Sequence, residues 1–317
     1  MKVKVKDLKD GTLFYVNNGA WTGYITTEDG QKVCYAGVNT KCPTEKFTNR
    51  FIVNDTYDLD VDILSGGLMK NYEFNAERTK NELVSWIRTW FHNNGKDCNA
   101  VLGISGGKDS TIAAALCAEA LGKDRVIGVL LPNGEQADIM DSYEVCDILG
   151  IRSYVMDISE GVNATYKQMQ KCGLEITQQV RENTPPMERT KCIRSVCRSQ
   201  NGRMVNTCNY SEDFIGYFTI GGDGDGDFAP LGGLTKTEVV SIGYCLGLPT
   251  NLIEKAPSDG LCGKTDEDNF GFSYKDLDAY ITEGTCGNSI TDTKIKAKHD
   301  ANAFKLKPMP TFKPNFH

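Results

Sequence analysis

The sequence has few histidines and no long apolar run, and each shortage excludes a class of protein. Only three histidines occur in 317 residues, and they are scattered, which argues against a histidine-rich metal centre. The longest apolar stretches, such as VIGVLL at 126–131, are far too short to span a bilayer, so we expect no membrane partner. The N-terminal stretch MKVKVKDLKDG lacks an apolar signal core, and we therefore expect a cytoplasmic protein.

Positive charge is also not in excess. The chain carries 35 lysines and arginines against 42 aspartates and glutamates, a net charge of -7, which argues against a nucleic-acid partner. Its 12 cysteines include no C-x-x-C pair, and the nearest two are Cys192 and Cys197. Because a zinc site needs clustered thiolates or imidazoles, we interpret the cysteines as reduced thiols that pack as small hydrophobic side chains.

Residues 1–68 differ in residue pattern from the rest of the chain. Asn18-Gly19 and Asp29-Gly30 favour two-residue hairpin turns, since both central positions of such a turn need a positive φ. Around these dipeptides lie short stretches rich in aromatic and β-branched residues, at 12–16, 21–27, 32–37 and 51–55. The pattern predicts a small antiparallel β module, whose role the sequence does not define, followed by a second domain over residues 69–317.

The second domain begins with a helical spacing of apolar residues over 76–94. Strand and helix patterns then alternate along the chain, at 100–104, 111–122, 125–132, 137–150 and 152–158. Alternation at this spacing is typical of right-handed βαβ units. We therefore predict an α/β fold with a Rossmann-like parallel sheet and helices on both of its faces.

One stretch, GISGGKDSTIA at 103–113, which we call the phosphate loop, lies between the first predicted strand and the next helix. A ligand of a doubly wound sheet binds at this kind of position, and the positive end of the helix favours an anion. Gly106 and Gly107 allow the backbone to approach a phosphate closely. Asp109 would repel phosphate unless a divalent cation lay between them, so its presence predicts Mg²⁺.

The phosphate loop matches neither the Walker A motif nor the dinucleotide G-x-G-x-x-G spacing. It instead resembles the S-G-G-x-D-S loop of the N-type ATP pyrophosphatases, which cleave ATP between its α and β phosphates. Three later blocks resemble the catalytic domain of the ammonia-dependent NAD⁺ synthetase family: RMVNTCNYSEDFIGYFT (203–219), GGDGDGDFAPLGGLTKTEV (221–239) and KAPSDGLCGKTDEDNFGFSYKDLDAYI (255–281).

The resemblance implies an activity and its partners. ATP would adenylate the nicotinate carboxylate of deamido-NAD (nicotinic acid adenine dinucleotide), and ammonia would then displace AMP to give NAD⁺, with Mg²⁺ as cofactor. The family binds the deamido substrate at the interface of a homodimer. Residues 1–68 are too short for a nitrilase-type glutaminase, so we expect free ammonia as the nitrogen donor, although a separate protein that delivers ammonia stays an alternative.

The resemblance also assigns residues to each part of the site. The metal ligands would be Asp109 and Glu212, and the catalytic residues would be Asp223, Lys236 and Ser258. Asp259 would lie with Ser258 in a loop that closes over the phosphates. The ATP-binding set would be Gly103, Ser105, Gly106, Gly107, Lys108, Ser110, Gln136, Thr207, Lys236 and Ser258, and the deamido-NAD set would be Arg189, Lys191, Asp223 and His299.

Each assignment has a purely structural alternative. Glu212 and Asp223 are also typical of caps and turns, and Lys236 is also typical of a solvated first helical turn. The basic segment 181–200 is equally compatible with a solvated helix face, and His299-Asp300-Ala301 departs from the compact His-Lys-Arg of many family members. Two other functions stay open: adenylation of another substrate by an N-type ATP pyrophosphatase, or nucleotide sensing without turnover.

Overall fold

The computed structural model describes residues 74–136, 139–254 and 265–312 with their side chains, and the backbone of six strands between residues 2 and 64. Four sequence predictions lie outside the described residues. These are the turns at Asn18-Gly19 and Asp29-Gly30, the domain boundary at residue 68, and the loop with Ser258 and Asp259.

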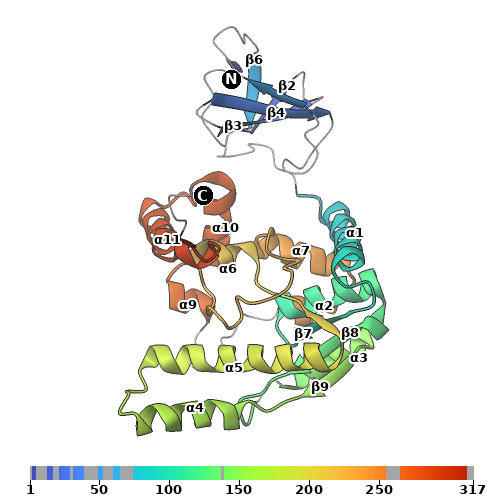
Figure 1. Ribbon diagram of the computed structural model, residues 1–317, viewed down its shortest axis with the longest axis vertical. Helices are drawn as coiled ribbons and strands as arrows, with labels where there is room; N and C mark the ends of the chain where they lie inside the picture. Colours follow the sequence, from blue (N-terminus) through green and yellow to red (C-terminus); the bar gives the residue numbers. More distant parts are fainter. Residues whose placement is uncertain are drawn as a thin grey trace. The chain divides into compact units, whose positions relative to one another are not determined.

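The chain divides into two compact units, of which the first comprises residues 1–73 together with 279–285. Its strands are β1 (Lys2–Lys4), β2 (Leu13–Val16), β3 (Trp21–Glu28), β4 (Gln31–Val38), β5 (Asn49–Ile52) and β6 (Asp60–Leu64), shown in blue in Figure 1. They follow the order β1-β6-β2-β3-β4-β5, and each described pair of neighbours is antiparallel.

The second unit contains a parallel sheet of four strands in the order β10-β7-β8-β9. Its strands are β7 (Asn99–Gly103), β8 (Val126–Leu130), β9 (Arg152–Val155) and β10 (Gly202–Met204). The first three confirm the predicted strands, while β10 was not predicted. The chain runs from β7 outward to β9 and returns to the other side of β7, so the order reverses between β7 and β10, where a doubly wound sheet binds its ligand.

Helices surround this sheet. In chain order they are α1 (Ala76–Asn94), α2 (Lys108–Leu121), η2 (Lys123–Arg125), α3 (Ile139–Leu149), α4 (Ser159–Lys171), α5 (Gln178–Ser199), α6 (Tyr210–Ile215), α7 (Lys236–Cys245), α8 (Thr250–Ile253), α9 (Asp266–Phe270), α10 (Tyr274–Glu283), α11 (Ser289–Asn302) and η3 (Ala303–Leu306). No described helix is long and apolar enough to pass through a membrane.

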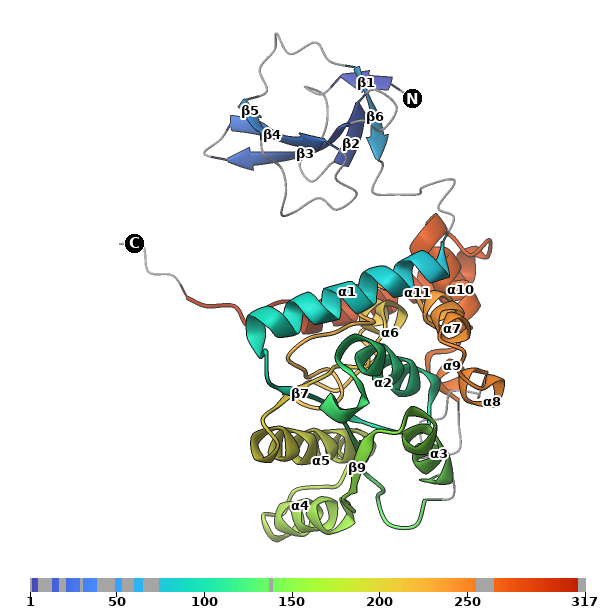
Figure 2. The same ribbon diagram turned by 90° about the vertical axis from the view of Figure 1, so that its right-hand side faces the viewer.

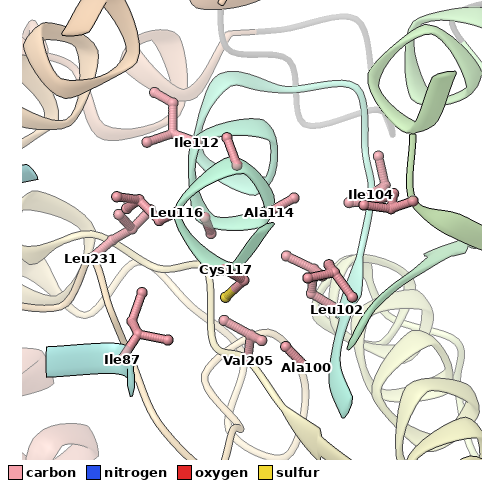
Figure 3. Packing of buried hydrophobic residues seen from close by; sticks show 14 of the residues in the cluster. Ile87, Ala100, Leu102, Ile104, Ile112, Ala114, Leu116, Cys117, Val205 and Leu231 are labelled. Carbon is pink, nitrogen blue, oxygen red and sulfur yellow. The ribbon is translucent and has the colours of Figure 1, made fainter. Parts of the chain in front are cut away.

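The two faces of the sheet bury separate apolar cores, because successive strand residues point to opposite sides. Ala100 and Leu102 of β7 pack with α1, α2 and α7, and Figure 3 shows them near Cys117 of α2 and Val205. Val101, between them, packs instead with side chains of α4 and α5. Figure 2 shows α1 and α2 above the strands and α4 and α5 below them, which confirms the predicted helices on both faces.

Helix α5 continues through Pro185 and Pro186, although proline cannot donate the usual backbone hydrogen bond. Helix α4 lies beside α5 in both ribbon views and supplies a partial substitute (Figure 1). The hydroxyl of Tyr166 on α4 lies 3.4 Å from the carbonyl oxygen of Arg181, which is the acceptor that Pro185 leaves without an N–H. The long helix is therefore compatible with its prolines because its neighbour contributes a donor.

Candidate active site

The phosphate loop follows β7 and enters α2, as predicted. Gly107 is the N-cap of α2 and is extended, and no side chain caps the helix there. Gly106 has a φ of +74°, and a Cβ at this position would lie 2.8 Å from the Cβ of Asp141. The positive φ and the close approach to Asp141 both favour glycine at position 106. Because no side chain caps α2, the N-terminus of this helix is available to an anion.

The serine hydroxyls of this loop hold its shape. Ser105 Oγ accepts a hydrogen bond from the Gly107 amide at 3.2 Å and lies 3.1 Å from Ser110 Oγ. Ser110 Oγ in turn donates to the Gly107 carbonyl at 3.1 Å. Thr111 Oγ1 donates to the same carbonyl at 2.8 Å. The loop is therefore a small closed network whose hydroxyls are already oriented around the turn.

Three of the predicted residues meet directly. The Lys236 ammonium lies 2.6 Å from Asp109 Oδ2 and 3.0 Å from Glu212 Oε1. The lysine is only 5% exposed, so the prediction that allowed a solvated first-turn lysine is wrong on this point. A buried ammonium between two carboxylates is a strong electrostatic arrangement, because few water molecules screen it.

Caps of two short helices position these side chains. Asn209, which follows β10, caps α6 with a capping box, and its Nδ2 also donates to Asp109 Oδ1 at 3.3 Å. Thr235 caps α7 in the same way, and Lys236 is the first residue of that helix. Glu212 does take part in a capping box, as the structural alternative proposed, yet its Oε1 is directed to Lys236.

Burial shifts the ionisation of the cluster. It raises the pKa of Glu212 to about 7, although Lys236 opposes the shift. Burial alone would lower the pKa of Lys236, but the carboxylates of Asp109 and Glu212 outweigh it and raise that pKa. The pKa of Tyr274 is raised by burial and by the carboxylates around it. The lysine is therefore a permanent cation in this site.

A divalent cation fits the donor set of this cluster. Asp109 and Glu212 supply hard carboxylate oxygens, and the Lys236 ammonium between them shows that the pair already holds positive charge. Mg²⁺ is usually bound by one or two carboxylates together with substrate phosphates. Among the described residues no group of three or more histidines, cysteines or acids is placed to hold a metal without such help.

The other predicted nucleotide contacts lie around the carboxyl end of the sheet. Gly103 is the last residue of β7 and Lys108 is the first of α2. Burial lowers the pKa of Lys108, and the charge of Lys236 adds to that shift. Thr207 follows β10, and Gln136 lies in the connection after β8. Neither is in a described strand, so the alternative of Thr207 as a strand hydroxyl is wrong.

The predicted residues for the deamido substrate are more dispersed. Arg189 Nε on α5 donates to the Leu131 carbonyl at 3.2 Å, next to the carboxyl end of β8. Lys191 is exposed on α5 and pairs with Glu188 one turn earlier. His299 Nδ1 on α11 lies 2.7 Å from the Phe214 carbonyl oxygen, and its ring stacks on Phe214. Lys191 and His299 thus already have structural roles.

Asp223 lies in a turn that α5 holds in place. Its Oδ1 accepts a hydrogen bond from the Thr219 amide at 2.8 Å, and Thr219 Oγ1 donates to Asn183 of α5 at 2.9 Å. Arg194, also on α5, binds Asp225 through two nitrogens and Asp227 through a third. The acidic run 223–227 is therefore a fixed turn at the site.

Two residues of α10 at the site were missed by the sequence interpretation. The Tyr274 hydroxyl lies 3.2 Å from Glu212 Oε1 and 3.1 Å from Asp266 Oδ2, and its ring lies under the Lys236 ammonium at 4.7 Å. Asp278 is 6% exposed and binds residues next to Glu212 and Lys236. Both belong to the block 255–281, but no local motif distinguishes them from its other residues.

Comparison with known sequences gives a family match over most of the chain. The family model described as NAD synthase matches residues 79–314. An NH(3)-dependent NAD(+) synthetase of Pyrococcus furiosus is 35% identical over 73% of this chain and 85% of that protein. An NH(3)-dependent NAD(+) synthetase of Finegoldia magna is 33% identical over 70% of this chain and 92% of that protein.

Solved structures with the same fold agree with this match. The structure of an NMN synthetase from Francisella tularensis aligns with a TM-score of 0.69 and 29% identity, over 77% of this chain and 100% of that one. An NH3-dependent NAD synthetase from Campylobacter jejuni aligns with a TM-score of 0.62 and 26% identity, over 76% of this chain and 100% of that one.

Proposed function

The chain belongs to the NAD synthase family, and on that premise we propose that it is a ligase that makes NAD⁺ from deamido-NAD, ATP and ammonia. The nicotinate carboxylate attacks the α-phosphorus of ATP, the bond to pyrophosphate breaks, and an adenylate forms. Ammonia then attacks the activated carbonyl, loses a proton and displaces AMP. The single observation that carries the proposal is the buried Asp109–Lys236–Glu212 cluster beside the phosphate loop.

In the first step the difficulty is charge, because a carboxylate approaches a polyphosphate and the leaving pyrophosphate gains negative charge. The N-terminus of α2 and the Ser105 and Ser110 hydroxyls are proposed to bind the phosphates. Lys108 and Lys236 supply cations next to them. Asp109 and Glu212 would hold Mg²⁺, which neutralises phosphate charge when bound.

Binding of the nucleotides would use the remaining predicted residues. Gly103, Gly106 and Gly107 shape the loop, while Gln136 and Thr207 follow strands whose carboxyl ends meet at the same edge of the sheet. Asp223 is proposed to lie on the side of the site where ammonia and the nicotinate ring enter. Arg189 is a better candidate than Lys191 for the deamido substrate, because Arg189 reaches the carboxyl end of β8. A role for His299 and for Ser258 stays a prediction.

Incubation of the full chain with deamido-NAD, ATP, Mg²⁺ and ammonium tests the proposal. We expect NAD⁺, AMP and pyrophosphate in equal amounts, and glutamine should not replace ammonium. Asp109→Asn should abolish turnover while the variant still folds. Release of ADP and phosphate in place of AMP and pyrophosphate would contradict the proposal.

A second substrate is favoured by one observation. The solved structure of the Francisella tularensis NMN synthetase aligns with the highest TM-score of those compared above. An amidating enzyme with that product would take the mononucleotide acid, which lacks the adenylate half of the dinucleotide. Measurement of kcat/KM for the dinucleotide and the mononucleotide acid side by side decides between the two substrates.

We also propose two features of the whole protein. The antiparallel pairing within the six-stranded sheet, which contains strands β1 through β6, supports a separate N-terminal β module over residues 1–68. A homodimer is proposed from the family resemblance, and light scattering on the purified chain would measure it.

A further inference from the structure

Asp278, on the first turns of α10, is a buried carboxylate with no place in the proposed chemistry. Its Oδ2 accepts hydrogen bonds from the Thr237 amide at 2.8 Å and from Thr237 Oγ1 at 2.6 Å. Its Oδ1 accepts a hydrogen bond from the Ser211 hydroxyl. A carboxylate at 6% exposure with three donors is held firmly and is costly to replace.

The partners of Asp278 are the chain neighbours of two site residues. Ser211 precedes Glu212 on α6, and Thr237 follows Lys236 on α7. Ser211 Oγ also accepts a hydrogen bond from the Lys236 amide at 2.9 Å, so the two helix N-termini are joined through one hydroxyl. Asp278 therefore binds both helices within one residue of the side chains that meet at the site.

We propose that Asp278 is a positioning residue, which sets the separation of the Glu212 carboxylate and the Lys236 ammonium through Ser211 and Thr237. The proposal rests on the proposed function, in which these two groups act on the metal and the phosphates. No described hydrogen bond joins Asp278 to either of these side chains, and its effect passes through the backbones of α6 and α7.

A carboxylate suits this task better than an amide. Both of its oxygens accept, and the described donors are the Ser211 hydroxyl and two groups of Thr237. Asparagine would direct an NH₂ group toward one of them, and Ser211 would have to turn its proton away. The negative charge also lies at the N-terminus of α7, where the helix dipole favours it. Asp278→Asn therefore alters the hydrogen bonds from Ser211 and Thr237 and leaves the volume of the side chain nearly unchanged.

The same helix carries a matched control. Asp276 accepts hydrogen bonds from the Ser273 hydroxyl at 2.7 Å and the Ser273 amide at 3.4 Å, and it contacts no residue of α6 or α7 in any described hydrogen bond. Asp276→Asn removes a half-buried carboxylate of α10 whose described hydrogen bonds stay within the first turn of that helix. If Asp278 only stabilised α10, the two variants would behave alike.

The first experiment compares both variants of the full chain with the wild type in the NAD⁺ assay. For Asp278→Asn we expect kcat to fall about 10- to 100-fold, since a misplacement of roughly 1 Å has this effect, with KM for ATP and ammonium changed less than about threefold. Asp276→Asn should keep the wild-type kcat even if its melting temperature falls. Equal kcat values for Asp278→Asn and the wild type would overturn the proposal, and so would an equal loss in the two variants.

A second measurement does not depend on activity. Crystal structures of the wild type and of Asp278→Asn should show a longer distance between Lys236 Nζ and Glu212 Oε1 in the variant. An unchanged distance would overturn the proposal. If the wild type makes no NAD⁺, the proposed function fails, and this distance still decides whether Asp278 positions the pair.

Discussion

At the residue scale, the central feature is a buried lysine that lies between two half-buried carboxylates. Removing one partner of a buried ion pair leaves uncompensated charge, which typically destabilises a protein by about 3–5 kcal/mol. We therefore expect Lys236→Met to lower the free energy of unfolding by roughly 3 kcal/mol. Urea unfolding measures this change.

The same variant tests the proposed metal ligands. Without the ammonium, Asp109 and Glu212 face each other with no cation, so Mg²⁺ should raise the melting temperature of Lys236→Met more than that of the wild type. Lys108→Met is the control, because it removes a cation of the same loop that forms no described ion pair with the two acids. Equal responses to Mg²⁺ in all three proteins would argue against the metal assignment.

Gly106 offers a second test at this scale. A side chain at a φ of +74° costs about 1–2 kcal/mol, and its Cβ would also collide with Asp141. Gly173 has a φ of +73° with open space around it, so Gly173→Ala measures the backbone term alone. We expect Gly106→Ala to be the less stable variant in thermal unfolding and to bind ATP more weakly. If both alanine variants have the same melting temperature, the close packing against Asp141 does not contribute to the cost of the substitution.

Site residues were predictable only where a local motif carries them. The phosphate loop is one continuous stretch, so its glycines, serines and Asp109 could be assigned from their order. Tyr274 and Asp278 form hydrogen bonds with partners at 212 and 237, and no spacing in the sequence predicts such contacts. The burial of Lys236 could not be predicted from the sequence either, because the first turn of a helix is usually solvated and its partners Asp109 and Glu212 are distant in the chain.

At the scale of elements, strong periodic patterns were predicted well and weak ones were not. The strands β7 and β8 are apolar runs, and α1 has a clear apolar stripe. β10 has only the residues Gly202–Met204, with no β-branched side chain, and its pairing with β7 is a tertiary event. α5 contains two prolines that propensity would place at a helix end, and packing against α4 overrides that preference.

The link between α5 and the acidic turn predicts a pH dependence. Hydrogen bonds from Arg194 lower the pKa of Asp225, so this interaction stabilises the fold above the unfolded value of about 3.9 and is lost as the pH falls through the lowered pKa. Arg194→Met should therefore lose stability at pH 7, by about 1 kcal/mol, and differ less from the wild type at pH 3.

Urea unfolding at both pH values measures this difference. Arg198→Met, which changes an exposed arginine of the same helix, serves as the control and should unfold like the wild type. A stability gap between Arg194→Met and the wild type that stays constant with pH would contradict the role given to Asp225.

At the scale of the whole molecule, the family match begins at residue 79, and the second compact unit begins at residue 74. Both apolar cores of the parallel sheet consist of residues from this second unit. We expect a fragment of residues 74–317 to unfold cooperatively and to retain NAD⁺ synthesis within about threefold of the full chain, since the proposed machinery is contained in it. A folded but inactive fragment would show that the N-terminal residues contribute to catalysis.

The class and layering of the second unit were predictable because they follow from the alternation of strand and helix patterns along the chain. The role of the predicted β module was not settled by sequence, since the module has no ligand motif. The homodimer was not settled either, since it depends on a surface that a second copy of the chain must match.

Three buried thiols of the parallel-sheet unit can report its transient opening. Burial raises the pKa of Cys117 to about 12 and those of Cys146 and Cys197 to about 11, so in the native state they are neither ionised nor accessible at pH 8. Alkylation of these three sulfurs must wait for a transient opening of the unit. Their modification rate, followed by mass spectrometry, would report how often the interior is exposed.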